Sequence, residues 1–413
     1  MDERDLIYDW NQAGEIWDQP PYRIQFDDET LRDGLQSPSV RTPSIDQKVE
    51  ILHLMDRLGI DTADIGLPGA GPHVVRDVTV LAQEIVSSKL ALRANCAART
   101  LARDIEPVAD VAQKVGLPIE VCTFIGSSPI RQYAESWTVE LMMQHTREAV
   151  TFAVRHGLDV MYVTEDTIRA HPETLRALFL AAIECGAKRL CLCDTVGHAT
   201  PAGVHNLLAF TREVIQQSGA HVGIDWHGHS DRGLAVINTI AAIRAGATRV
   251  HGCAIGIGER VGNTPLDQLM VNLRLLGWID NDLTALGEYC EAVSSATGVP
   301  IPVNYPMVGS DAFRTGTGVH AAAVIKAWRK GQDWLADRVY SGVPAGLIGR
   351  RQEIEVGPMS GESNVVHWLE SRGIEPSSER VQAVFQRAKS VDRVLSEHEI
   401  NDVLAALAET RVP

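Results

Sequence analysis

The feature that most constrains this fold is a rhythm of short apolar runs that alternate with segments of helical spacing. Such alternation is typical of parallel strands joined by crossover helices. Eight repeats within about 250 residues favour an α/β fold of the closed (β/α)8 TIM barrel type over an open doubly wound sheet. No Gly-x-Gly-x-x-Gly turn follows the first run, as a dinucleotide-binding fold would require. The apolar runs are residues 23–27, 60–66, 89–95, 117–124, 159–163, 188–193, 221–226 and 248–254.

The remainder of the chain is organised differently. Residues 1–21 lack periodicity and are expected to form an N-terminal arm, followed by the predicted catalytic barrel at residues 22–280. Residues 281–306 are predicted to be a helix and a proline-rich linker. Residues 307–413 predict a mostly helical C-terminal subdomain, with helical segments at 318–330, 362–371, 378–390 and 396–409.

Composition and charge exclude several classes of protein. The formal net charge of −15 leaves no basic surplus to neutralise nucleic-acid phosphates or an anionic membrane. No apolar run approaches the roughly 20 residues of a membrane span, and the acidic N-terminus is unlike a secretory signal. Seven scattered cysteines indicate free thiols in a reducing compartment. We expect a cytoplasmic protein with neither nucleic acid nor membrane as partner.

Two histidines, His227 and His229, follow the seventh apolar run. Residues i and i+2 of a strand point to the same side, so both imidazoles can face one metal ion. The alternative is a pair of histidines satisfied by local hydrogen bonds. After the first strand, Asp33 offers an oxygen ligand beside Arg32, and the glycine-rich loop after the eighth run offers the amide of Asn263. Such a mixed ligand set suits Mg²⁺, Mn²⁺ or Zn²⁺ as a Lewis acid.

Polar residues also mark most of the other predicted strand ends, where TIM barrels carry their active sites. Asp64 ends the second strand, Arg93 and Asn95 the third, Glu165 the fifth and Thr195 the sixth. Convergent polar chemistry at nearly every strand end is hard to explain by structure alone. Taken by itself, the acidic stretch at residues 27–33 would also fit a solvated turn.

Three motifs resemble the signatures of the DRE-TIM metallolyase superfamily. They are Thr-Leu-Arg-Asp-Gly at residues 30–34, His-x-His at residues 227–229 and the glycine-rich loop at residues 256–263. Within that superfamily the sequence is most similar to the branch of 2-isopropylmalate synthases and homocitrate synthases. The resemblance covers roughly residues 22–370, and three motifs in this order at barrel strand ends are specific.

The resemblance implies a metal-dependent Claisen condensation of acetyl-CoA with a 2-oxo acid, which gives a 2-substituted malate and CoA. Arg32 would stabilise the enolate of acetyl-CoA and the developing alkoxide. Glu165 would contact the metal-bound water or assist proton transfer. Thr195 would bind the oxo acid's carboxylate, and Gln36 would lie near the acyl group. The implied ligands of the divalent metal are Asp33, His227, His229 and Asn263.

The C-terminal region resembles the helical subdomain of these synthases, which reaches into the barrel of a partner subunit. The similar stretches are residues 310–313, 318–320 and 338–340. By this resemblance His320 and Tyr340 match a pair that acts in trans, with His320 as a base for deprotonating the acetyl methyl group. The working unit would then be a homodimer. The alternative for His320 is a helix-face histidine.

Departures from the family pattern indicate an apolar oxo acid. Homocitrate synthases hold the distal carboxylate with an arginine just before the glutamate on the fifth strand, where this chain has Met161 and Val163. An unpaired buried carboxylate would be costly. Cys122 replaces a common histidine, and residues 69–71 are smaller than typical, which leaves room for 2-oxoisovalerate or for phenylpyruvate, the precursor of benzylmalate. We assign substrate contacts to Gln36, Asp64, Arg93, Met161, Val163 and Thr195.

Other functions fit parts of the pattern. A lyase of the 3-hydroxy-3-methylglutaryl-CoA lyase type shares the metal ligands and Arg32, but those enzymes carry a cysteine in the glycine-rich loop, whereas Cys253 precedes that loop here. Homocitrate-synthase-like condensation with a dicarboxylic oxo acid is a second alternative. A non-catalytic metal-binding protein would be expected to lose these chemical residues, and they are present. We also expect no C-terminal regulatory domain, and so no feedback inhibition by leucine through one.

Overall fold

The computed structural model describes residues 3–14 and 16–409. Two compact units divide the chain. One unit is Asn11–Pro300, and the other combines the residues before it with those from Ile301 onward. None of the helices in the described residues is long and apolar enough to cross a membrane.

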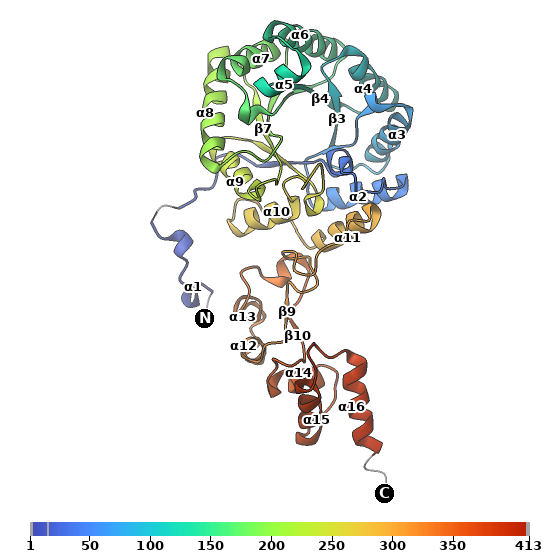
Figure 1. Cartoon of the computed structure of the whole chain (residues 1–413), viewed down its shortest axis with the longest axis vertical. Coiled ribbons are helices and arrows are strands. Elements are labelled where there is room, and N and C mark those ends of the chain that lie inside the picture. The colour runs from blue at the N-terminus through green and yellow to red at the C-terminus, as the bar shows by residue number, and fades with distance from the viewer. Residues whose placement is uncertain (1–2, 15, 410–413) are drawn as a thin grey trace. The chain divides into compact units, whose positions relative to one another are not determined.

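The larger unit is a closed barrel of eight parallel strands in chain order, ringed by helices (Figure 1). The ring closes where β1 pairs with β8, with Gln25 opposite Arg249 and Asp28 opposite Gly252. The predicted TIM barrel is therefore confirmed. The strands are β1 (Gln25–Asp28), β2 (Thr62–Asp64), β3 (Arg93–Arg99), β4 (Ile119–Gly126), β5 (Val160–Glu165), β6 (Arg189–Asp194), β7 (Gly223–Gly228) and β8 (Arg249–Gly252).

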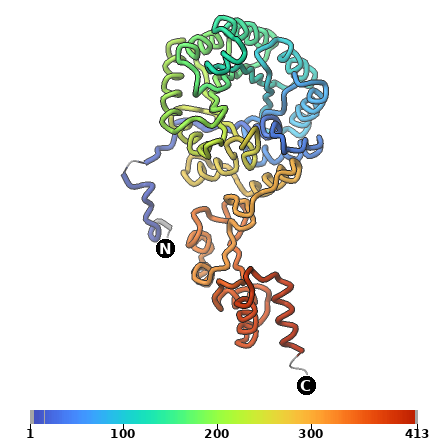
Figure 2. Tube along the Cα trace, viewed as in Figure 1, coloured from blue at the N-terminus to red at the C-terminus, as the bar shows by residue number. Residues whose placement is uncertain are grey.

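Helices form the outer layer of the barrel, and the trace in Figure 2 runs round the ring from blue through green to yellow. Ser44 caps α2 through a reciprocal capping box with Gln47, and Thr200 caps α8 ahead of Pro201. Periodicity did not predict the short helices α5 and α10. The helices are α2 (Ile45–Arg57), α3 (Pro72–Ser87), α4 (Ala102–Val115), α5 (Pro129–Glu135), α6 (Val139–Arg155), α7 (Pro172–Glu184), α8 (Pro201–Ser218), α9 (Ala235–Ala245), α10 (Leu266–Leu275) and α11 (Leu286–Thr297).

The third strand begins later than predicted. It starts at Arg93 rather than at residue 89. The preceding residues form a turn in which the backbone N–H of Ala91 donates to the Asp56 carboxylate at 2.6 Å, so they are unavailable to the sheet. Arg93 pairs opposite Thr62, the first residue of β2, and thus lies at the amino end of the barrel.

A buried ionic network fills part of the barrel interior. The Arg249 side chain is 1% exposed and donates to Asp225 and, at 2.6 Å, to Glu120. Arg189 also pairs with Asp225, which is fully buried. Burial acts to raise the pKa of Asp225, but the two guanidinium groups outweigh it and hold that pKa far below its usual range. The charges are therefore buried only as compensated pairs.

The second unit is mostly helical, as predicted, and adds a two-stranded parallel sheet in which Glu353 lies opposite Arg314. The sequence did not predict α13. The elements are α1 (Glu3–Leu6), β9 (Arg314–Thr315), α12 (Gly318–Arg329), α13 (Asp333–Arg338), β10 (Glu353–Ile354), α14 (Glu362–Glu370), α15 (Ser378–Lys389) and α16 (Glu397–Glu409).

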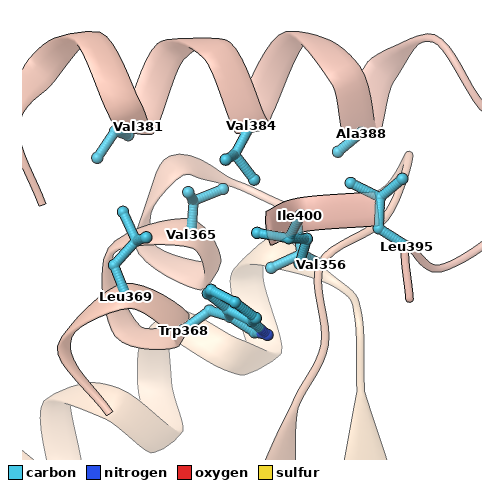
Figure 3. Packing of buried hydrophobic residues seen from close by; sticks show 9 residues of the cluster. All are labelled: Val356, Val365, Trp368, Leu369, Val381, Val384, Ala388, Leu395 and Ile400. Carbon is cyan, nitrogen blue, oxygen red and sulfur yellow. The ribbon is translucent and has the colours of Figure 1, made fainter. Parts of the chain in front are cut away.

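Helices α14, α15 and α16 share a small apolar core of their own (Figure 3). Spacings of three and four residues place Val381, Val384 and Ala388 on one face of α15. This face packs in one cluster with Leu369 and Trp368 of α14. The C-terminal helices thus have a core of packed aliphatic side chains and do not depend on propensity alone.

Leu369→Ala should destabilise this helical core. Leu369 is 0% exposed, so its truncation leaves a cavity, and we expect a cost of about 2–5 kcal/mol. Hydrogen exchange should show faster exchange in α14, α15 and α16 with little change in the barrel strands. Met359→Ala is the control, because Met359 is 72% exposed in the same unit. Equal acceleration in both variants would contradict the packing described.

Candidate active site and metal centre

A cavity of about 300 Å³ lies at the carboxyl ends of the barrel strands. One part of its wall is polar and comes from β7, β8 and the segment after β1. The other part is mainly apolar and comes from β3, β4, β5 and β6. The predicted site residues that line this cavity are Arg32, Asp33, Gln36, Met161, Val163, Glu165, Thr195, His227 and His229.

The predicted metal ligands converge at the polar wall. The Nε2 atoms of His227 and His229 are 3.1 Å apart, and His229 Nε2 is 3.7 Å from Asp33 Oδ2. The two histidines and Asp33 each offer one ligand atom, and these atoms lie within 4.8 Å of one another. Asn263 Nδ2 donates to the same Asp33 oxygen at 2.7 Å. The structure therefore brings all four predicted ligands together.

Unsatisfied polar atoms show that this cluster fits a cation. Asn263 Oδ1 and His229 Nδ1 are buried and have no hydrogen-bond partner among the described residues. Two imidazole nitrogens that face each other at 3.1 Å cannot both present lone pairs without a shared proton or a metal ion between them. Nitrogen and oxygen donors of this kind suit Zn²⁺, Mn²⁺ or Mg²⁺.

A tight loop after β8 places Asn263 beside Asp33. Gly262 has φ +93°, and a Cβ there would lie 1.7 Å from the carbonyl oxygen of Gly256. At Gly258, with φ +146°, a Cβ would lie 2.2 Å from Asn263 Nδ2. Only glycine fits both positions. The loop also forms an isolated antiparallel bridge between His229 and Asn263, which fixes the ligands relative to one another.

Arg32 is held at the cavity by three carboxylates. It donates to Asp64 at 2.7 Å, to Asp33 at 2.8 Å and to Glu29. Burial raises the pKa of Asp64 to about 7, although the Arg32 charge opposes the shift. Asp64 is not among the residues that line the cavity, and its contact with substrate stays a prediction. Its side chain is buried against Arg32 and orients that residue.

Glu165 and Thr195 sit at the ends of neighbouring strands. The Glu165 carboxylate pairs with Arg131 at 3.0 Å, and burial raises the pKa of this carboxyl above its usual value. Thr195 Oγ1 accepts a hydrogen bond of 2.8 Å from the backbone N–H of Asp166. Its own O–H therefore remains available to donate to a ligand in the cavity.

Five predicted residues are not among those that line this cavity, namely Asp64, Arg93, Asn263, His320 and Tyr340. The later start of the third strand places the exposed Arg93 at the amino end of the barrel, and its substrate contact stays a prediction. His320 and Tyr340 belong to the other compact unit. Their rings stack with centroids 4.0 Å apart, and both side chains are exposed.

Residues that sequence reasoning missed complete both walls. Glu29 and His251 lie in the polar wall, and His251 Nδ1 is 2.6 Å from Glu29 Oε1. On the apolar side, the missed residues are Cys191 and Cys193, which pack with Cys122. The period of two in β6 was the available signal, because Cys191, Cys193 and Thr195 alternate along one face.

A family model described as HMGL-like matches residues 23–293. The chain belongs to the HMGL-like family. The homocitrate synthase AksA of Methanopyrus kandleri is 33% identical over 391 residues, which cover 93% of this chain and 92% of that protein. A probable 2-isopropylmalate synthase of the same organism is 32% identical over 374 residues, with 90% and 70% coverage. The predicted membership of the DRE-TIM metallolyase superfamily is confirmed.

Solved structures agree on the barrel. The crystal structure of the Bacillus subtilis HMG-CoA lyase has a TM-score of 0.57 and 21% identity, covering 68% of this chain and 96% of that one. The HMG-CoA lyase of Pseudomonas aeruginosa gives a TM-score of 0.56 at 17% identity, with 67% and 94% coverage. At these identities the likeness concerns the fold alone.

His229 should stay neutral well below the usual histidine range in the metal-free protein. Burial and the neighbouring His227 lower the pKa of His229 to about 4. The unfolded chain takes up this proton near pH 6.5, so the unfolded state binds more protons between about pH 6.5 and pH 4, and stability falls as the pH drops through that window. NMR titration of the ring should show no protonation above about pH 5. Between about pH 6.5 and pH 4, the His229→Gln variant should lose less unfolding free energy than the unmodified protein. A His229 ring that titrates near pH 6.5 would contradict the lowered pKa.

Proposed function

We propose that this chain is a divalent-metal-dependent synthase that condenses acetyl-CoA with an apolar 2-oxo acid. CoA and a 2-substituted malate would be the products. The observation that carries the proposal is the division of one cavity into a metal-binding polar wall and a mainly apolar wall. The names of the relatives, a homocitrate synthase and a probable 2-isopropylmalate synthase, support the reaction type.

The polar wall supplies the groups that would stabilise the negative charge that develops on the substrates. A divalent metal held by Asp33, His227, His229 and Asn263 would act as a Lewis acid on the oxo acid's carbonyl. Three of the five N–H groups of Arg32 donate hydrogen bonds to carboxylates, and these bonds hold the guanidinium at the cavity. Its remaining N–H groups can stabilise the enolate and the alkoxide without reorganisation at the moment of reaction.

Residues at the strand ends beside that wall would transfer protons and orient the oxo acid. A carboxyl whose pKa is raised by burial, as at Glu165, is better matched to proton transfer near neutral pH than an ordinary glutamate. The free O–H of Thr195 can donate to the carboxylate of the oxo acid. Gln36 lines the same cavity, and the family resemblance supports a role for it near the acyl group.

The apolar wall indicates the substrate's side chain. Met161 and Val163 pack with three cysteines in one cluster. The cation that touches this cluster, Arg249, is already paired with Asp225 and Glu120. A distal carboxylate would therefore be buried there without its own partner, at a cost of several kcal/mol. This favours 2-oxoisovalerate or phenylpyruvate over 2-oxoglutarate.

We also propose that His320 and Tyr340 act in the barrel of a partner subunit, so that the working unit is a homodimer. Support comes from the family resemblance and from the exposure of the stacked pair, which leaves both rings accessible to another chain. In this role His320 is the base for the acetyl methyl group, and Tyr340 orients its ring by stacking.

Release of CoA from acetyl-CoA should depend on an apolar oxo acid and on a divalent metal. A thiol assay with 2-oxoisovalerate, phenylpyruvate, pyruvate and 2-oxoglutarate should give the highest kcat/KM with one of the first two. A chelator should abolish the release, and added Mg²⁺, Mn²⁺ or Zn²⁺ should restore it. Preference for 2-oxoglutarate would overturn the apolar assignment. Cleavage of 3-hydroxy-3-methylglutaryl-CoA without condensation would instead favour the lyase alternative.

Mixed dimers should test catalysis in trans. Asp33→Ala removes a barrel residue and His320→Ala removes the proposed base, so each variant alone should lose at least about 100-fold in kcat. Co-expressed subunits should recover up to about a quarter of the activity. About half of the dimers formed by random pairing are mixed, and one of the two sites in a mixed dimer holds both intact residues. Co-expression of Asp33→Ala with His229→Ala is the control, since both changes lie in the barrel. No recovery in the first mixture would argue against action in trans.

A further inference from the structure

Glu29 is a buried carboxylate at the cavity to which the proposed reaction assigns no task. Its side chain is 5% exposed. The Oε1 atom lies 3.2 Å from His227 Nδ1 and 2.6 Å from His251 Nδ1, and Oε2 accepts from Arg32. Three donors from three separate segments therefore meet on one carboxylate, which lines the cavity beside the metal-ligand cluster.

The contact to His227 determines which nitrogen of that ring is free. An ionised carboxylate only accepts hydrogen bonds, so the hydrogen of neutral His227 lies on Nδ1. Its Nε2 then presents a lone pair toward His229 Nε2, 3.1 Å away. Without this acceptor, neither the tautomer nor the rotation of the ring would be fixed, because the two nitrogens would be nearly equivalent.

A second histidine fixes Glu29 from the barrel interior. His251 is 1% exposed, and its Nε2 lies 3.0 Å from Asp225 Oδ2. Both of its ring nitrogens thus face carboxylate oxygens and donate to them. Asp225 is itself paired with Arg189 and Arg249, so the chain of contacts ends in the buried ionic network of the barrel.

We propose that Glu29 is a positioning residue for the metal centre, which holds His227 as the Nδ1–H tautomer with Nε2 directed at a divalent cation. His251 holds Glu29 in place for this task. The inference rests on the proposed metal-dependent function. Carboxylate partners of metal-ligating histidines typically contribute about 10–100-fold to metal affinity.

Glu29→Gln provides the test, with metal binding rather than turnover as the main measurement. The amide keeps one acceptor oxygen but turns the other position into a donor that faces Arg32 or a histidine N–H. Competition with a chromophoric chelator should show Co²⁺ and Zn²⁺ bound about 10–100-fold more weakly than by the unmodified protein. The visible absorption spectrum of bound Co²⁺ should also change, because it reports ligand geometry.

Glu120→Gln is the matched control, since Glu120 is a barrel carboxylate that pairs with Arg249 and, within the described residues, forms no hydrogen bond or ion pair with His227 or His251. We expect its metal affinity to stay within about twofold and its Co²⁺ spectrum to be unchanged. If Glu29→Gln fails to fold, Glu29→Asp keeps the charge but shortens the reach to His227, and it should show the same loss of affinity.

The outcomes separate this inference from the proposed function. If the unmodified protein binds no divalent metal, both the positioning role of Glu29 and the proposed metal-dependent function are overturned. Metal binding that is tight in the unmodified protein and undiminished in Glu29→Gln overturns the positioning role alone. An equal loss in Glu120→Gln also overturns it, because the effect would then come from buried charge in general.

Discussion

The structure depends on the compensation of charge buried inside the barrel. Arg32 joins the segment after β1 to β2 because it pairs at once with Glu29, Asp33 and Asp64. Breaking a buried pair typically costs about 3–5 kcal/mol, since the remaining charge stays buried without a partner. The ion pairs that hold Arg32 at the cavity thus also join the ends of two neighbouring barrel strands. Stability and site geometry cannot be varied separately here.

Much of the barrel and of the candidate metal site could be predicted from the sequence, because both rest on local periodicity. The alternation of apolar runs and helical segments is a direct consequence of burying strands inside a ring of helices. The i, i+2 spacing of His227 and His229 placed both imidazoles on one face. The third strand was misplaced because an apolar run alone cannot separate a strand from the turn before it. For that reason Arg93 was expected near the carboxyl end of the strand, whereas it lies at the first residue of β3.

The remaining site residues depend on contacts between distant segments. Glu29 and His251 are 222 positions apart and meet only because β1 closes against β8. Nothing in the acidic stretch distinguished Glu29 from Asp28, whose carboxylate instead accepts from Tyr289. The cysteine wall likewise requires the lateral register of β4, β5 and β6. Charged residues and the two-residue spacing of strands identify candidate site residues in the sequence. Which of these residues meet depends on how the strands pair in the closed barrel.

The separation of the two cavity walls has a consequence for evolvability. The candidate metal ligands come from β7 and from the segments after β1, β7 and β8, whereas the mainly apolar wall is formed by β3, β4, β5 and β6. Mutational libraries at Cys122, Met161, Val163, Cys191 and Cys193 could therefore diversify the accepted side chain while the metal-binding half stays intact. Under the proposed function, the strands that hold the metal ligands are therefore different from those that contact the substrate's side chain.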